Sequence, residues 1–448
     1  MIDKIDKVKK LLEKLPVDYA DIRIVKGPFT SLSIRDGKVV EVVESSNFGM
    51  GIRVLYSGSF GFASTNRDDE LERTAEKALK LARTAEGKVK LSCEKTYTER
   101  VEFKVRKNPK DFALVDKIKK LFSVESRAKQ KCIKNTSVSY TDACAEKFFL
   151  NSQGSEIIQK QTMTYMGIAA VAAREGIMQE GYEVLGAIGG MEALDDAEIK
   201  AERAAERAVK LLDAKTPKGG NFCCVIDGKL AGVLAHEAVG HASEADLVLA
   251  NNSALSNKTG EKIGTNHVNI VDDATINAFG SFAYDDDGVP GQKKYLMKNG
   301  ILNSFLHSRD TASEFKINST GNMRAQSYSD FPVVRMSNTF FERGEQNLNE
   351  IFDVRTGVYA KGMKGGQVNP KTGNFVFVAE EGFLIENGEL TKMLRDITLN
   401  GNILTTLKEI DAVGNDFMMS PGFCGKSGQT MRVSDGGPHL RIRSVAVG

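Results

Sequence analysis

The sequence predicts an α+β fold, with a duplicated unit of β-hairpins and a helix in the N-terminal half and a mainly antiparallel β domain in the C-terminal half. Three observations predict it. Alternating apolar and polar segments, separated by turn dipeptides, run along the chain, which is typical of β-hairpins. One pattern of strands and helix occurs twice before residue 212, and the composition changes at a polar joint around Pro217 and Gly219. A chain of 448 residues is also too long for one ordinary core.

The N-terminal half, residues 1–218, has the pattern of one supersecondary unit used twice. The two units cover about 20–86 and 132–212, and in each of them β-rich segments precede a helix. The word Met-Gly-Ile occupies matching places in both units, and their helices share the similar words AEKALKL and AERAVKL. We therefore predict a duplicated α+β region in which a connecting helix at about 108–130 joins the two units.

Apolar residues at i, i+3 and i+4 spacing predict the other helices of this half, at about 68–85 and 195–212 and at the start of the chain. In the helix predicted at the start of the chain, apolar residues such as Ile5 and Val8 stand between charged residues. The segment is therefore amphipathic and not a signal peptide. The small-apolar stretch GIAAVAA at 167–173 is far shorter than the roughly 20 residues that cross a membrane. These features predict a soluble, cytoplasmic protein with no membrane partner.

The C-terminal half, residues 219–448, has turn dipeptides between strand-like runs. YLMKNGILNSFL at 295–306 and GFLIENGELTKML at 382–394 have the alternation and the central Asn-Gly of β-hairpins. This half is therefore predicted to be a mainly antiparallel β domain. The exception is a helix from Gly228 to about Leu247, which carries two of the five histidines in the chain.

Charge and cysteine content exclude several classes of protein. Lys+Arg number 61 and Asp+Glu 59, for a net charge of +2, and no run of like charge is long enough for a nucleic-acid arm or a polybasic membrane patch. The six cysteines lack the spacing of a disulfide framework, which a chain of this size does not need. We therefore predict no direct nucleic-acid partner and no disulfide.

The word AHEAVGH places His236, Glu237 and His241 on the predicted C-terminal-half helix. In a chain with five histidines the cluster is informative, although its spacing differs from the familiar H-E-x-x-H motif. Positions i and i+5 point about 140° apart on an ideal α-helix. The two imidazoles can therefore share one ion only if the helix widens into a π-type bulge, or ends, near Gly240.

Two histidines with an adjacent glutamate are the layout of metal-assisted hydrolysis. The histidines would bind zinc, and Glu237 would act as general base on a zinc-bound water. Zinc needs a third protein ligand, for which Cys424 in PGFCGKSGQ is the best candidate because a thiolate suits this ion. His267, His307 and His439 remain possible ligands. The alternative that the paired histidines are only packing or capping residues also stays open.

With these two motifs, the chain resembles the TldD/PmbA family of metallopeptidases, and specifically its metal-bearing TldD type. HEAVGH together with PGFCGKSGQ is the discriminating pair, because the partner-type PmbA/TldE subunits lack the metal motif. The resemblance implies Zn²⁺ bound by His236, His241 and Cys424, with Glu237 catalytic. It covers nearly the whole chain, through HEAVGH at 236–241, GSFAYDDDGVPGQ at 280–292, SYSDFPVVRMSNTF at 327–340 and GFCGKSGQ at 422–429.

The resemblance also implies proteolysis of unfolded or extended peptides, and a dimer formed either with a second copy or with a metal-free PmbA/TldE-type homologue. The leading interpretation is a zinc-dependent peptide hydrolase of the EC 3.4 class. Two alternatives stay open. One is a non-catalytic peptide-binding or regulatory subunit whose metal is structural. The other is a thiol peptidase in which Cys424 is the nucleophile and a histidine is its base.

Two acidic sequence motifs are interpreted as turns. Asp285-Asp286-Asp287-Gly288 lacks the spaced oxygen ligands and the distal Glu of a calcium loop, so a solvated turn is favoured. Asp435-Gly436 has the composition of a turn between strands.

Overall fold

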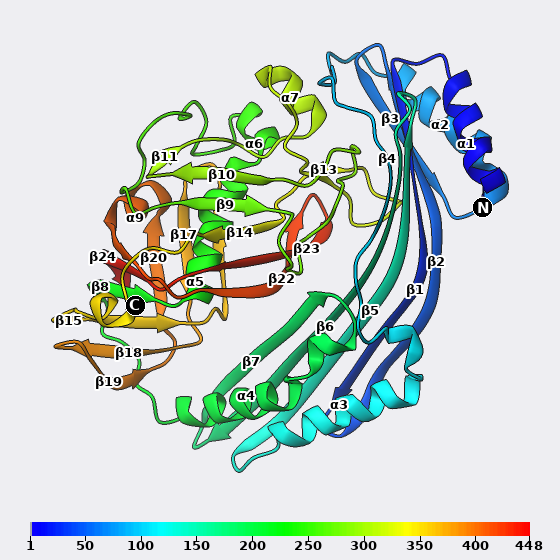
Figure 1. Cartoon of the computed structure of the whole chain (residues 1–448). Coiled ribbons are helices and arrows are strands. Elements are labelled where there is room, and N and C mark those ends of the chain that lie inside the picture. The colour runs from blue at the N-terminus through cyan, green and yellow to red at the C-terminus, as the bar shows by residue number, and fades with distance from the viewer. Residues whose placement is uncertain (1) are drawn as a thin grey trace.

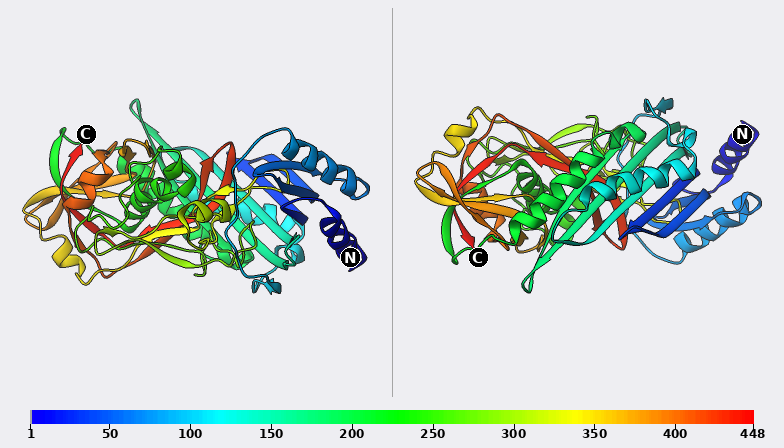
Figure 2. Two further views of the ribbon diagram at one scale, coloured as in Figure 1. Left: turned by 90° about the horizontal axis from the view of Figure 1, so that it is seen from above. Right: turned by 90° about the horizontal axis from the view of Figure 1, so that it is seen from below.

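The structure is a computed structural model that describes residues 2–448, with side chains from Ile5 onward. The fold is α+β, as the sequence predicted (Figure 1). A long, curved sheet from the N-terminal half bends around one side of a C-terminal domain that contains two further large sheets. The two ends of the chain lie at opposite ends of the molecule (Figure 2).

The N-terminal sheet consists of two units with the same order of elements, three antiparallel strands and then a helix. The units join where the first strand of one pairs with the first strand of the other, and a short strand pairs in parallel with the start of β6. The elements are β1 (Tyr19–Arg35), β2 (Lys38–Tyr56), β3 (Ser59–Thr65), α2 (Leu71–Arg83), β4 (Thr98–Glu102), β5 (Ile133–Asn151), β6 (Glu156–Arg174), β7 (Ile177–Ile188) and α4 (Ala197–Leu211).

Tight turns connect these long strands. Asp36-Gly37, Ser57-Gly58 and Glu175-Gly176 each contain two residues with positive φ, which is the backbone of a type I′ turn. The twist of this turn matches the twist of the flanking strands, so all 17 residues of β1 pair with β2, from Tyr19 with Leu55 to Arg35 with Lys38.

Helices cover the face of this sheet that is turned away from the C-terminal domain. The helices α1 (Ile2–Lys14) and α2 pack with buried side chains such as Ile22 and Ile52 of the first unit. The helices α3 (Leu114–Ala128) and α4 pack with Val138 and Ile168 of the second unit, and the view from below in Figure 2 shows them lying across the strands.

The predicted connecting helix, 108–130, is too long. The side chain of Asn108 accepts a hydrogen bond from the Lys110 N–H and caps a short 3-10 turn at Pro109–Asp111. The backbone is then extended at Ala113, and α3 begins at Leu114. A local side-chain hydrogen bond competes with helix formation here, which the periodicity of apolar residues does not reveal.

The C-terminal domain contains two large sheets with a helix between them. The nine-stranded sheet has the order β16-β17-β20-β24-β8-β15-β18-β19, with β21 paired to β24, and the six-stranded sheet has the order β11-β10-β9-β14-β23-β22. Among the described residues, the pairs in these sheets are antiparallel except β8 with β15 and β14 with β23. The two predicted hairpins are present, as β10 with β11 and β18 with β19.

The strands of this domain are β8 (Gly220–Ile226), β9 (Ile270–Asp273), β10 (Lys293–Lys298), β11 (Ile301–Leu302), β12 (Met323–Arg324), β13 (Val333–Val334), β14 (Asn338–Phe341), β15 (Thr356–Lys361), β16 (Gly365–Val368), β17 (Asn374–Val378), β18 (Glu381–Glu386), β19 (Glu389–Leu394), β20 (Thr398–Asn402), β21 (Ile410–Val413), β22 (Met418–Lys426), β23 (Gln429–Gly437) and β24 (Leu440–Val447). Its helices are α5 (Gly228–Val233), α6 (Ala245–Leu249), α7 (Arg309–Phe315), α8 (Leu348–Ile351) and α9 (Ile403–Glu409).

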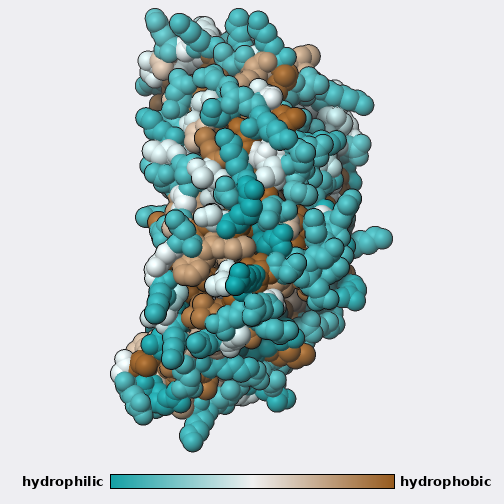
Figure 3. Space-filling view, turned by 90° about the vertical axis from the view of Figure 1, so that its left-hand side faces the viewer, coloured by the Kyte–Doolittle hydropathy of each residue, from teal (hydrophilic) through white to brown (hydrophobic). Residues whose placement is uncertain are grey.

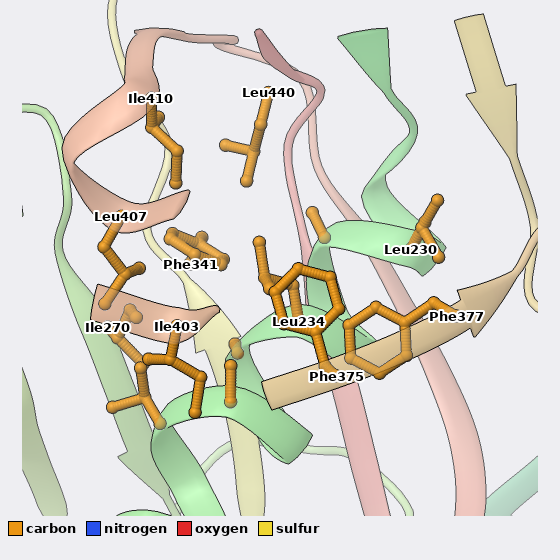
Figure 4. Packing of buried hydrophobic residues seen from close by; sticks show 14 of the residues in the cluster. Leu230, Leu234, Ile270, Phe341, Phe375, Phe377, Ile403, Leu407, Ile410 and Leu440 are labelled. Carbon is orange, nitrogen blue, oxygen red and sulfur yellow. The ribbon is translucent and has the colours of Figure 1, made fainter. Parts of the chain in front are cut away.

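The core of this domain holds the α5 segment in place. Figure 4 shows Leu230 and Leu234 pointing toward Phe375 and Phe377 of β17, and the same cluster includes Phe341 of β14. The surface in Figure 3 is mostly hydrophilic, with apolar residues in small groups between polar ones. None of the helices in residues 2–448 is long and apolar enough to span a membrane.

Buried ion pairs join the N-terminal sheet to the C-terminal domain. Arg53 of β2 pairs with Asp21 of β1 at 2.6 Å and with Asp287, and all three side chains are buried. Lys147 of β5 pairs with Asp286 at 2.8 Å. The expected turn at 285–288 is present, but it is not solvated: its three aspartates are buried in the contact between the two halves, where sheet cations pair with Asp286 and Asp287.

Candidate metal centre

The segment that carries the two histidines starts at a well-defined cap. Asp227 follows β8, and its Oδ1 accepts hydrogen bonds from the N–H groups of Leu230 at 2.9 Å and Gly362 at 3.1 Å. An Asp side chain in this position satisfies free N–H groups at a helix start. The strand β8 and this cap therefore fix where the helix begins.

The predicted helix from Gly228 to Leu247 is not continuous. After α5 the backbone forms a π-helix over Leu234–Gly240, then a 3-10 turn over His241–Ser243, and then α6. The N–H of His241 donates to the carbonyl of His236, the i to i+5 bond of a π-helix. This bond brings the two imidazoles together, with ring centroids 5.2 Å apart and planes at 88°. The widening that the H-E-x-x-x-H spacing requires is therefore confirmed.

Gly240 is the last residue of the π-helix and stands where a side chain would not fit. A Cβ at this position would lie 2.1 Å from the Sδ of Met336, which is fully buried. The helix also approaches β23 closely, since a Cβ at Gly232 would lie 2.2 Å from the backbone N of Gly436. The glycines thus let the histidine-bearing segment pack directly against the six-stranded sheet.

Cys424 comes from β22 at the edge of that sheet and meets the histidines. Its Sγ lies 3.2 Å from Nε2 of His241, and one ligand atom from each of His236, His241 and Cys424 lies within 4.8 Å of the others. The guanidinium of buried Arg335 donates to the carbonyl oxygen of Cys424 and so helps to fix the strand. The structure brings together all three predicted ligands.

The electrostatics of the cluster favour a thiolate. Burial alone would raise the pKa of Cys424, but His236 and His241 outweigh it and lower the pKa to about 5. Burial lowers the pKa of His241, whereas the carboxylate of Glu244 and the Cys424 sulfur raise it well above its ordinary value. A thiolate is the form that binds zinc, so the arrangement is prepared for a cation between these side chains.

Glu237 lies beside the cluster and reaches solvent. Its Oε2 is 3.9 Å from Nε2 of His241, and its side chain is 31% exposed, against 13% for His241. The carboxylate can therefore contact water and a bound substrate, although Glu237 is not one of the three candidate metal ligands.

A residue that the sequence interpretation missed is Glu244. It is fully buried, and its Oε2 accepts a hydrogen bond from Nδ1 of His241 at 3.1 Å and pairs with Lys426 at 3.2 Å. The bond keeps the proton of His241 on Nδ1, so Nε2 is free to bind a metal. Its place three residues after His241, one helical turn on, was the available signal.

Glu244→Gln should weaken zinc binding by roughly 10–100-fold, since a neutral amide polarises the imidazole less than a carboxylate does. Competition with a chromogenic chelator of known zinc affinity measures this. Glu261→Gln is the matched control, because Glu261 is exposed and forms a surface ion pair with Lys258. Equal zinc affinity of the two variants would contradict the role of Glu244.

Asp435 is a second acidic residue that the structure brings near the cluster. The expected turn at Asp435-Gly436 is wrong, because both residues lie inside β23. Burial raises the pKa of Asp435 to about 6, His236 and Lys229 oppose the shift, and Glu237 adds to it. Asp435 lies where it does because β23 pairs with both β14 and β22. Sequence composition does not reveal this pairing.

The remaining candidate ligands lie elsewhere. His307 bonds to Thr311 at 3.2 Å, and burial lowers its pKa to about 4. His439 contacts Asp416 at 2.7 Å and the hydroxyl of Tyr359 at 3.0 Å. His267 is exposed. In the part of the chain that the structure describes, the three-residue cluster is the only group of at least three such side chains close enough to hold an ion.

The donor set fits zinc. Imidazole and thiolate groups both serve as ligands in catalytic zinc sites, which use three protein ligands and leave one position open for water or substrate. His236 is buried and its Nδ1 has no hydrogen-bond partner in the described structure, which is costly for a polar atom in the interior. A cation held between these side chains would offset part of that cost.

Comparison with known proteins identifies related families, sequences and structures. Three segments match protein-family models: residues 20–82 match PmbA/TldA metallopeptidase domain 1, residues 107–212 match the PmbA/TldA metallopeptidase central domain, and residues 219–448 match the PmbA/TldA metallopeptidase C-terminal domain. Together they cover most of the chain.

Curated relatives match nearly the whole length of the chain. The chain is 41% identical to a metalloprotease from Methanothermobacter thermautotrophicus over 435 residues, which are 96% of each chain. It is 32% identical to a zinc metalloprotease TldD homolog from Saccharolobus solfataricus, over 98% of each chain. The crystal structure of TldE from Thermococcus kodakarensis superposes with a TM-score of 0.82, at 21% identity, over 99% of this chain and 100% of that one, and so shows the same fold.

Proposed function

The chain belongs to the TldD/PmbA family of metallopeptidases, and on that premise we propose that it is a zinc-dependent peptidase that hydrolyses unfolded or extended peptides. One observation carries the proposal. Three donors typical of zinc, from His236, His241 and Cys424, lie within 4.8 Å of one another, and the carboxylate of Glu237 lies beside them. The metalloprotease names of full-length relatives support the same kind of hydrolase.

The chain's own residues divide the chemical work. Zinc, when bound by the three ligands, would supply a Lewis acid that polarises the peptide carbonyl. Glu237 accepts a proton from the attacking water and donates it to the leaving amine nitrogen. Its partial exposure supports this role, because the carboxylate must reach both water and substrate. Glu244 holds the ring of His241 in one tautomer and one orientation throughout.

The position of Cys424 supports an extended substrate. The strand β22 lies at the end of the six-stranded sheet, so within the described residues it pairs through backbone hydrogen bonds with β23 alone, although β7 packs near it. An extended peptide can add to such an edge through main-chain hydrogen bonds, which do not depend on its sequence. A folded domain has no free strand to add. Binding along β22 would therefore select unfolded chains.

The duplicated region, 1–218, would act as a curved wall beside the metal-bearing domain, 219–448. We propose that the chain works in the cytoplasm as a dimer, either with itself or with a metal-free PmbA/TldE-type homologue. The likeness to a TldE structure supports a partner of the same fold.

The direct test is cleavage of an unstructured, fluorescence-quenched peptide by purified protein. We expect cleavage with one zinc per chain, loss of cleavage after treatment with a chelator, and recovery when zinc but not magnesium is returned. A stably folded small domain of similar composition should stay intact. Tightly bound zinc with no cleavage of any peptide would instead favour a regulatory subunit with a structural metal.

A further inference from the structure

A cavity lies between the N-terminal sheet and the C-terminal domain, close to the metal centre but separate from it. Its volume is about 170 Å³, and its wall includes Arg23 and Lys147 from the sheet and Arg324, Met431 and Arg432 from the C-terminal domain. Met431 is the register partner of Cys424 in the β22–β23 pair, so the cavity begins one strand away from a predicted metal ligand. Interfaces between domains are common places for ligands.

A second contact connects this wall to the metal centre. The guanidinium of Arg324 donates to the carbonyl of Met336 at 2.6 Å. Met336 in turn packs against Gly240 at the end of the π-helix. The cavity and the histidine-bearing segment therefore share one packed layer.

The wall has an excess of positive charge. Four of its side chains are cationic, those of Arg23, Lys147, Arg324 and Arg432, whereas two carboxylates, from Asp285 and Asp286, also line it. Asp286 pairs with Lys147 at 2.8 Å and with Arg23 at 3.7 Å. Both oxygens of Asp285 accept hydrogen bonds from backbone N–H groups.

Two of the arginines have no carboxylate partner among the described residues. The hydrogen bonds of Arg324 go to the carbonyls of Met336 and Arg432, and those of Arg432 go to two backbone carbonyls and to the amide oxygen of Gln161. Burial, and the charge of the neighbouring Arg432, lower the pKa of Arg324, and burial lowers that of Arg432 to about 10. No carboxylate lies at ion-pair distance from either guanidinium in the described residues; Asp286 acts on both, and Asp272 on Arg324, only at longer range.

Arg23, in the same wall, is a buried side chain with an unsatisfied hydrogen-bond donor. The side chain is 2% exposed, and its Nε has no hydrogen-bond partner in the described structure. One guanidinium nitrogen donates to the carbonyl of Asp330 at 2.7 Å, and the other lies only at the long distance of 3.7 Å from Asp286. A buried donor without an acceptor is costly, and an anion in the cavity would remove that cost.

We propose that this cavity binds a carboxylate group of the peptide substrate, supplied either by its C-terminus or by an acidic side chain. Planar guanidinium groups match carboxylates in a bidentate way, and a small space of about 170 Å³ suits a chain end or a single side chain better than a continuous chain. The proposal rests on the proposed peptidase function and adds a preference to it: main-chain pairing along β22 tolerates any sequence, and the cavity selects a negative group near the cleavage site.

The test measures binding in a protein that does not cleave. Zinc-loaded Glu237→Gln protein is titrated into three fluorescent decapeptides of neutral, unstructured sequence: one with a free C-terminus, its C-terminal amide, and the amide with one internal aspartate. Charge-assisted hydrogen bonds predict that one or both carboxylate-bearing peptides bind about tenfold more tightly than the plain amide. Which of the two binds more tightly identifies the source of the carboxylate.

Three further substitutions in the same background locate the effect. Lys147→Met should remove most of the preference, because the freed Asp286 carboxylate also repels the ligand. Asp286→Asn should increase the preference. Lys160→Met is the matched control, since Lys160 lies on the opposite face of the same sheet, next to the register partner of Lys147, and pairs with Glu102. It should leave the preference unchanged.

The outcome separates this inference from the function on which it rests. If wild-type protein cleaves the peptides but all three bind the Glu237→Gln protein equally, the cavity does not recognise a carboxylate although the peptidase stands. A preference that Lys160→Met reduces as much as Lys147→Met would equally overturn the proposal, because it would reflect only the general charge of the sheet.

Discussion

Glu237→Gln should reduce cleavage of an unstructured peptide by about 10²–10⁴-fold, the usual contribution of a general base. The amide keeps the shape of the side chain but cannot accept the proton of the attacking water. Because Glu237 is not one of the three closest donors in the cluster, zinc should remain bound near one ion per chain. Cleavage kinetics and elemental analysis of the same preparation measure both quantities.

The control for this change is Glu206→Gln, which removes the same charge from an exposed position on α4. Its activity and its zinc content should match those of the wild type. If Glu237→Gln cleaved at the wild-type rate, another group would have to transfer the proton. If it lost zinc, Glu237 would be a ligand, and its assignment as base would need revision.

Cys424→Ser should remove zinc and activity together. A serine hydroxyl is not ionised at neutral pH, whereas the pKa of Cys424 lies at about 5 and leaves a thiolate ready to bind. Loss of a direct ligand should weaken zinc by more than the roughly 10–100-fold expected for loss of an outer partner such as Glu244. Chelator competition gives the zinc affinity, and the peptide assay gives the activity.

Cys93→Ser is the matched control for that experiment, because Cys93 is exposed and lies outside the cluster. It should keep zinc and full activity. The thiol-peptidase alternative makes the opposite prediction for Cys424→Ser: zinc content would stay unchanged while cleavage was lost, and alkylating reagents would inhibit the zinc-loaded protein. Zinc analysis of this one variant therefore decides between the two chemistries.

The fold class could be predicted because its signals are local. Type I′ turns at Asp36-Gly37, Asn299-Gly300 and Asn387-Gly388 depend on residues that tolerate positive φ, and these dipeptides stand out in the sequence. The same rule failed at Asp435-Gly436, which lies within β23. Composition allows a turn, but pairing with strands on both sides decides against it.

The sequence predicted the helical part of the candidate site. The spacing of His236 and His241 required a widened helix, and the π-helix supplies it, because geometry along one helix follows from sequence separation alone. The contact of Cys424 with the two histidines does not follow from local geometry. It depends on β22 pairing with β23 and on the close contact between Gly232 and Gly436. Ligand chemistry made Cys424 a candidate, and the resemblance to a family, not the spacing, strengthened that choice.

The sequence by itself determined the duplicated strand-and-helix pattern, the β-rich second half and the histidine-glutamate word, since each depends on neighbours within a few turns or one hairpin. Only the tertiary structure decided that Glu244 orients His241, that the acidic word at 285–288 is buried, and that four cations surround one cavity. The physical reason is that the charge state and the surroundings of a side chain depend on groups far along the chain. Lys147 and Asp286 are separated by 139 positions, yet their charged groups lie 2.8 Å apart.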